Sequence, residues 1–297
     1  MFPMPSPRGR LSAGARSALR GLARVLRGTT TSWWRELLLI GVLYGIYEVS
    51  RGVGDVDVSS ALANGREILH LERVWHISPE HVLNEALSNV TFIAVVASYF
   101  YSVMHYIVTP IVLVWMYRSH REHYGRARTA LAISTGLGLV GYLLLPTAPP
   151  RMLAGSGLRD TLADTQNWGW WGGDGSVPRG LGALTNQFAA MPSLHVGWAL
   201  WCGVLIAVYA RRRWVRVLGV AYPIATTLVV LATGNHYLLD ALAGCVTMGA
   251  GALLAAAIGG HPDPGPGAAE IGKVSVPATP RELVDLTEPA GATVGAE

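Results

Sequence analysis

The stretch WVRVLGVAYPIATTLVVLATGNHYLLDALAGCVTMGAGALLAAAI, residues 214–258, decides the fold expected for this chain. It consists of two apolar segments, 214–232 and 237–258, separated only by TGNH at 233–236. An α-helix of about 20 apolar residues crosses the roughly 30 Å hydrocarbon core of a bilayer. The pattern therefore predicts two membrane spans joined by a tight turn.

The rest of the composition agrees with a membrane protein. Of 297 residues, 51% are hydrophobic and 14% are charged, and the mean hydropathy is +0.35, which is too apolar for a soluble domain of this size. Three further segments, 33–49, 129–145 and 192–210, have the length and character of spans. The region 87–117 is too long for one straight span and too short for two.

Arginine placement settles the number of spans, because basic residues favour cytoplasmic loops. Arginines cluster around the start of the first span, at 118–128 and at 211–216. With all three clusters in the cytoplasm, the region 87–117 becomes one kinked or tilted span. The sequence thus predicts an all-α, polytopic bundle of six transmembrane helices with both termini cytoplasmic. The membrane expected is a plasma membrane, and the short, arginine-rich chain suggests a bacterial one.

Three regions outside the spans complete the predicted organisation. Residues 1–32 are expected to form a disordered basic cytosolic arm, and residues 259–297 a disordered cytosolic tail. Between them, residues 33–258 form the membrane domain. Within its first outer loop, the stretch 67–87 is expected to be an amphipathic interfacial helix on the membrane surface.

The predicted orientation gathers APPR (148–151), MPSLH (191–195) and GNHYLLD (234–240) at the extracytoplasmic face. Ionisable side chains at membrane depth are candidates for functional sites. His195 lies one turn into its span, after Ser193, where free backbone N–H groups favour an anion. His236 and Asp240 are four residues apart and share a helix face, and a carboxylate there fixes the tautomer of an imidazole.

Each of these residues also has a structural interpretation. A single histidine near a helix end is usually structural, and a buried histidine–aspartate pair can simply lock helix packing. Arg151 has a planar fork that suits phosphate, but an interfacial arginine also snorkels to lipid headgroups. The presence of two histidines at the same membrane face favours a functional site over these structural interpretations. Cys202 and Cys245 lie in apolar runs and are expected to be small buried hydrophobes.

Three motifs, LLLPTAPPR (143–151), AAMPSLH (189–195) and GNHYLLDALAG (234–244), lie at consecutive span ends. They resemble the type 2 phosphatidic acid phosphatase superfamily over about residues 35–258. The nearest branch by resemblance is that of the inositol phosphorylceramide synthases and their bacterial relatives, which are inositolphosphotransferases. YFYSVMH at 99–105 and LERVWHI at 71–77 are similar to the same branch.

The resemblance implies a mechanism without metal or cofactor. His236 would attack phosphorus and become a phosphohistidine, while Asp240 orients it. His195 would protonate the departing oxygen and then activate the acceptor. Ser193 and Arg151 would hold the phosphoryl oxygens.

This chain departs from the superfamily at two phosphate ligands. The usual lysine of the first motif is Leu144, and the Ser-Arg pair of the third motif is replaced by Val229 and Val230. Asn235 is a candidate substitute in phosphate binding, as are Arg179, Asn186 and Gln187.

Several alternatives stay open. The motifs do not separate a lipid phosphatase from a phosphotransferase, since water or an alcohol can attack the same phosphoenzyme. A metal hydrolase is another enzyme class, although the spacing lacks HExxH. A transporter or lipid flippase could use intramembrane His and Asp as a proton relay.

The tryptophans of the second outer loop, Trp168, Trp170 and Trp171, are either interfacial anchors or part of a lid over a lipid headgroup. A nucleic-acid partner is not expected, and the partners predicted are a membrane lipid phosphate or phospholipid and the bilayer.

Overall fold

The computed structural model describes residues 57–172, 175–178 and 186–259, together with Trp34, Leu38, Gly41 and Gly45. The predicted arm, most of the predicted first span (33–49) and the predicted tail after Gly259 lie outside the described residues.

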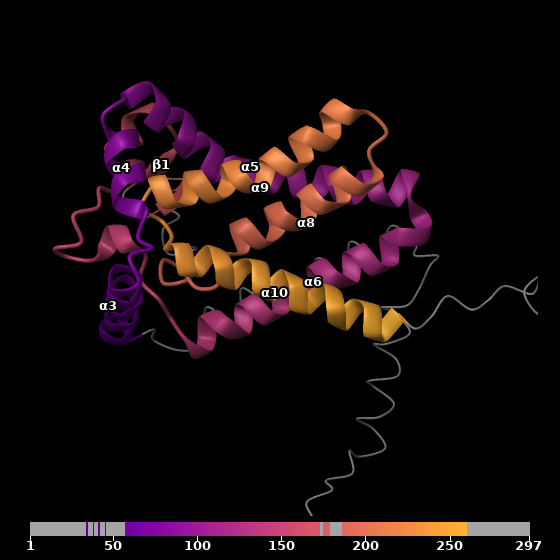
Figure 1. Cartoon of the computed structure of the whole chain (residues 1–297), viewed down its shortest axis with the longest axis horizontal. Coiled ribbons are helices and arrows are strands. Elements are labelled where there is room, and N and C mark those ends of the chain that lie inside the picture. The colour runs from indigo at the N-terminus through magenta and orange to yellow at the C-terminus, as the bar shows by residue number, and fades with distance from the viewer. Residues whose placement is uncertain are drawn as a thin grey trace, which may run out of the picture. The chain divides into compact units, whose positions relative to one another are not determined.

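The described chain is almost entirely helical (Figure 1). The longer helices are α3 (Val58–Val74), α4 (Glu80–Ser88), α5 (Thr91–Ser119), α6 (Arg121–Leu144), α8 (Leu194–Tyr209), α9 (Arg213–Ala232) and α10 (Leu238–Gly259). Between α6 and α8 lie short elements: η1 (Pro150–Met152), α7 (Thr161–Asp164), η2 (Gln166–Trp168) and an antiparallel pair of strands, β1 (Trp171–Gly172) and β2 (Gly175–Pro178).

Four helices are long and apolar enough to cross a membrane: α5, α6, α9 and α10. The chain is therefore a multi-pass membrane protein. The sixteen residues of α8 are equally apolar but extend only about 24 Å at 1.5 Å per residue. The predicted total of six spans is not reached within the described residues.

The region 87–117 contains one candidate span rather than two, as predicted, because its residues from Thr91 onward lie in the single helix α5, with Pro110 inside it. Its first two residues belong to α4. The span predicted to begin at 129 begins at Arg121 instead. Arginine, glutamate and alanine are good helix formers, so the basic stretch extends the helix by two turns beyond its apolar part. The apolar segment from 192 becomes helical at Leu194, after Ser193 caps it.

The prediction of one amphipathic helix over 67–87 is wrong. The stretch contains the end of α3 and nearly all of α4, separated at residues 75–79. His76 has a φ of 56°, a left-handed conformation that ends a helix. Pro79 then precedes the first residue of α4, and the fixed φ of proline suits a helix start.

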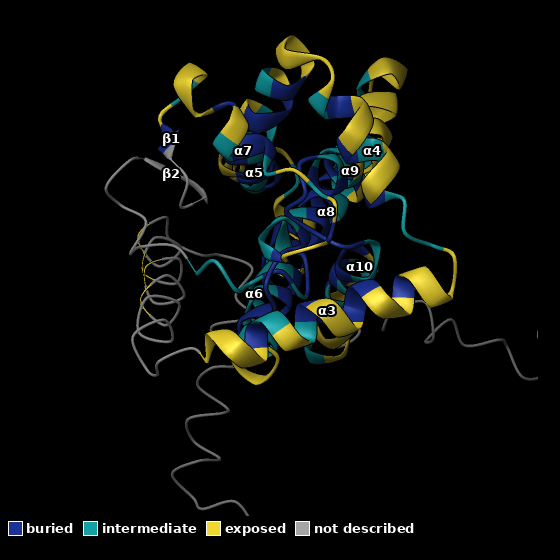
Figure 2. Ribbon diagram, turned by 90° about the vertical axis from the view of Figure 1, so that its left-hand side faces the viewer, coloured by how far each residue is buried: buried dark blue, intermediate teal, exposed yellow. Residues whose placement is uncertain are grey.

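The helices pack in pairs, α10 along α6 and α8 along α9, while α8 also contacts α5 and α10 (Figure 1). Buried residues concentrate where α8 lies among these neighbours, and α3 alternates between buried and exposed residues (Figure 2). One apolar cluster, formed by Ala61, Ile68, Leu69, Ala148, Leu153, Ala190 and Tyr237, lies where α3 meets the loops at one end of the bundle. These loops carry the motifs.

Candidate active site

Backbone hydrogen bonds bring the three motifs together at one end of the bundle. Thr147, just after α6, donates from its N–H to the Phe188 carbonyl at 2.7 Å and accepts from the Ala190 N–H at 3.2 Å. The Arg151 N–H donates to the Gly234 carbonyl at 3.0 Å. These contacts bring the loops that carry APPR, MPSLH and GNHYLLD together, while their location at the extracytoplasmic face stays a prediction.

His236 and Asp240 form a buried pair at the start of α10. His236 is 3% exposed and Asp240 is 0% exposed. Nδ1 of His236 lies 2.9 Å from the Ala190 carbonyl oxygen and 3.4 Å from Oδ2 of Asp240. Both neighbours accept hydrogen bonds, so Nδ1 carries the proton and Nε2 keeps its lone pair. This tautomer is the one that a nucleophilic imidazole needs.

His195 lies beside this pair, with its ring centroid 5.6 Å from that of His236. It belongs to the first turn of α8. Its Nε2 is buried and meets no hydrogen-bond partner among the described residues. A buried ring nitrogen without a partner is costly, and a substrate oxygen placed between the two histidines would relieve that cost.

Two side chains of α5 complete the surroundings of His195 and were not assigned a role from the sequence. The Tyr101 ring stacks on the His195 ring with centroids 4.6 Å apart, and the His105 ring meets its edge at 4.4 Å. They lie four residues apart, on one face of α5. The stretch YFYSVMH, which contains both residues, resembles the family but does not by itself predict a role for either.

Ser193 acts as the N-cap of α8. It is fully buried, and its Oγ accepts the Val196 N–H at 3.4 Å. Its own N–H donates to the Asp240 carbonyl at 3.0 Å, which ties the start of α8 to α10. Gly244 permits this close approach, since a Cβ there would overlap the Ser193 carbonyl. A contact of Ser193 with phosphate stays a prediction.

Arg151 and Asn235 are in direct contact. Nε of Arg151 donates to Oδ1 of Asn235 at 2.9 Å, which places the guanidinium beside the residue that precedes His236. Nη1 of Arg151 donates to Oδ2 of Asp160 at 2.5 Å. The arginine side chain is only 6% exposed, so Asp160 holds the position that an anionic ligand of Arg151 would take. Asp160 was not predicted as a site residue.

The tryptophan loop is anchored to α5 through Tyr99. The Tyr99 hydroxyl donates to the Trp168 carbonyl at 2.7 Å, and its ring meets Trp170 and Trp171 edge-on. Trp171 is fully buried, whereas Trp168 is 64% exposed. Trp171 is thus a packing residue beneath the loop, while the lid remains a prediction for the others.

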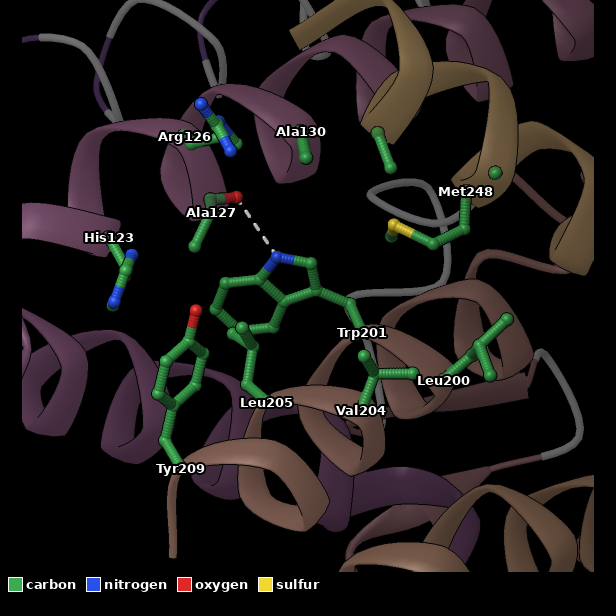
Figure 3. A pocket seen from close by; sticks show the side chains of 12 residues that line it. His123, Arg126, Ala127, Ala130, Leu200, Trp201, Val204, Leu205, Tyr209 and Met248 are labelled. Atoms are coloured by element: carbon green, nitrogen blue, oxygen red, sulfur yellow. Dashed lines mark hydrogen bonds between the residues drawn. The ribbon is translucent and has the colours of Figure 1, made fainter. Parts of the chain in front are cut away.

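A separate cavity of about 300 Å³ lies at the opposite end of the bundle (Figure 3). It is formed by α6, α8 and α10, and Trp201 in its wall donates to the Ala127 carbonyl at 2.9 Å. Its walls are mainly apolar, with His123 and Arg126 at one side. It contains none of the predicted site residues.

The remaining predicted residues are placed as follows. Cys202 is buried, Cys245 is half-buried, and both are free thiols. Asn186 and Gln187 precede the Thr147–Ala189 bridge, and Arg179 lies outside the described residues. In the described part of the chain, no group of three His, Cys, Asp or Glu side chains is arranged to hold a metal ion.

Comparison with known families gives one result. The family PAP2_3, described as PAP2 superfamily, matches residues 66–254, which include every motif residue described above. Neither the curated proteins nor the solved structures gave a match.

Proposed function

The chain belongs to the PAP2 superfamily, and we propose that it is a lipid phosphatase or phosphotransferase that acts through a phosphohistidine at His236. The superfamily consists generally of phosphatases that act through a histidine. The observation that carries the proposal is the fixed tautomer of His236, whose Nδ1 meets two acceptors.

In the first step, the lone pair on Nε2 of His236 attacks phosphorus, and the bond from phosphorus to the leaving oxygen breaks. His195 gives a proton from its Nε2 to that oxygen. The imidazole of His236 gains positive charge as the nitrogen–phosphorus bond forms, and Asp240 lies where a carboxylate stabilises that charge. Arg151 and Asn235 are proposed to hold the phosphoryl oxygens, with Arg151 exchanging Asp160 for phosphate.

In the second step, His195 takes the proton of an incoming hydroxyl, whose oxygen attacks phosphorus and breaks its bond to His236. Water gives free phosphate, and an alcohol gives a new phosphate ester. The resemblance to inositol phosphorylceramide synthases, together with the apolar residues at 144, 229 and 230, favours an alcohol acceptor. We place the site at the extracytoplasmic face on the distribution of arginines.

The test uses the purified full-length protein in lipid nanodiscs. It is supplied with a polyprenyl phosphate, phosphatidic acid or phosphatidylinositol, each with and without an alcohol acceptor, and free phosphate and new lipid are both measured. His236→Ala and His195→Ala should each abolish turnover, and His236→Ala should also abolish an acid-labile, alkali-stable phosphoryl label on the protein. The control is His70→Ala, an exposed histidine on α3. Full activity in either active-site variant would refute the mechanism.

A further inference from the structure

The start of α10 is occupied by three carboxyl groups from three different helices. The backbone N–H groups of residues 237, 238 and 239 donate, in that order, to Asp240 at 3.0 Å, Glu80 at 2.7 Å and Glu72 at 2.7 Å. The first N–H groups of a helix have no partner within it and favour negative charge. Here the protein supplies that charge itself, so these amides are not open to a substrate phosphate.

Glu72 and Glu80 differ from ordinary helix caps because they are buried together. Glu72, from α3, is 0% exposed, and Glu80, from α4, is 1% exposed. Oε2 of each carboxyl meets no donor in the described part of the chain. The two carboxyl groups bind adjacent backbone amides of one helix start, and they interact with one another electrostatically. Two carboxyl groups can share a hydrogen bond only when one of them holds a proton.

The electrostatics favour keeping that proton. Burial, reinforced by the charges of Glu80 and Asp240, raises the pKa of Glu72 to about 8, although the Leu239 N–H opposes the shift. Burial also raises the pKa of Glu80. The titratable groups that face the pair are Asp240 and Tyr237 at the start of α10. No ion pair is formed by either glutamate within the described residues.

We propose that Glu72 and Glu80 are positioning residues that share one proton and hold the first turn of α10, and with it His236, in place for catalysis. This rests on the proposed function, in which His236 is the nucleophile. His236 lies two residues before the first of the two amides bound by Glu80 and Glu72, and Asp240 directly follows the second. A shift of this turn therefore moves the nucleophile and its carboxylate partner together.

Loss of the shared proton changes the charge balance. With it, the three carboxyl groups carry two negative charges at one helix start, and without it they carry three in a buried region. Repulsion then loosens the contacts of α3 and α4 with α10. The pair thus makes the geometry of the nucleophile dependent on pH, through a site that does not touch the substrate.

The experiment compares the parent protein with Glu72→Gln and Glu72→Ala, and uses Glu67→Gln, an exposed glutamate on α3, as the control. The first measurement is thermal unfolding in detergent against pH, without substrate. The folded protein holds a proton on Glu72 that the unfolded chain releases above its ordinary pKa of 4.5. Stability should therefore fall as pH rises from 4.5 to about 8. Glu72→Gln should remove this part of the pH dependence, and Glu67→Gln should retain it.

The second measurement is kcat and KM against pH in the lipid phosphate assay. Glu72→Ala should lower kcat by up to about 10²-fold, the size expected for a misplaced catalytic group, with little change in KM. Glu72→Gln should recover part of that loss, because its amide supplies a permanent donor to Glu80, and its activity should extend to higher pH than that of the parent.

The two measurements test the role of the Glu72–Glu80 pair separately from the proposed function. An unfolding profile of Glu72→Gln that still matches the parent would overturn the shared proton, and a parental kcat in Glu72→Ala would overturn the positioning role. If Glu72→Ala does not fold, the unfolding and kinetic data of Glu72→Gln decide both points. If the parent turns over no lipid phosphate, the proposed function fails, while the unfolding data still judge the pair.

Discussion

Replacing Asp240 with asparagine tests how His236, the proposed nucleophile, is held in place. Oδ2 of Asp240 faces two donors, the Tyr237 N–H at 3.0 Å and Nδ1 of His236 at 3.4 Å. An asparagine can present its carbonyl oxygen to both, so the geometry should survive. What is lost is the negative charge beside the imidazole as it becomes phosphorylated.

The expected magnitude follows from the second partner of His236. Where an aspartate alone fixes the tautomer of a catalytic histidine, the asparagine variant loses about 10⁴-fold in kcat. Here the Ala190 carbonyl accepts from Nδ1 at 2.9 Å, closer than the carboxylate, so the tautomer remains fixed. The remaining loss is that of a charged acceptor replaced by a neutral one, about 1–2 kcal/mol, which lowers kcat roughly 5- to 30-fold.

The assay is steady-state release or transfer of phosphate, with thermal unfolding as a check on folding. Asp164→Asn, at an exposed carboxylate on α7, is the matched control and should retain the parental kcat. A loss near 10⁴-fold in Asp240→Asn would show that the Ala190 carbonyl does not hold the tautomer. An unchanged kcat would show that the carboxylate charge plays no part in the reaction.

Three further substitutions have defined outcomes. Arg151→Lys keeps the charge but loses the fork that reaches Asn235 and Asp160, so KM for the lipid phosphate should rise roughly tenfold; an unchanged KM would remove Arg151 from phosphate binding. Tyr101→Ala removes the ring stacked on His195 and should lower kcat about 2- to 10-fold, with a smaller loss in Tyr101→Phe; equal losses would point to the hydroxyl instead. Gly244→Ala drives a Cβ into the Ser193 carbonyl and should lower the free energy of unfolding by about 1–3 kcal/mol, whereas Gly249→Ala, with open space at its Cβ, should not.

The sequence predicted that the candidate site residues at helix ends lie near one another. Arg151, His195 and His236 each fall where an apolar segment meets a turn, and the charge pattern assigned all three turns to one end of the bundle. Connectivity alone was enough to bring them together. The same reasoning predicted α5 as a single helix, since parity of crossings excludes two.

Residues inside an apolar helix could not be found in this way. Tyr101 and His105 point at His195 only because of the rotation of α5 about its axis, and a helix that is apolar on all sides carries no pattern that fixes this rotation. The roles of Glu72 and Glu80 could not be predicted from the sequence for a different reason. Charged residues outside the apolar segments usually indicate a solvated surface. The burial of these two carboxyl groups is possible because they accept hydrogen bonds from the backbone N–H groups at the start of α10.

The ion pair between Arg151 and Asp160 has a consequence for selectivity. Asp160 lies nine residues from Arg151 in the sequence and competes with any incoming anion for its guanidinium. The apparent affinity of Arg151 for that anion is therefore reduced by the fraction of time that Asp160 stays bound. A phosphate monoester with two charges displaces a carboxylate more readily than a diester with one. If Arg151 binds the substrate phosphate as proposed, this internal carboxylate would favour doubly charged phosphates over singly charged ones.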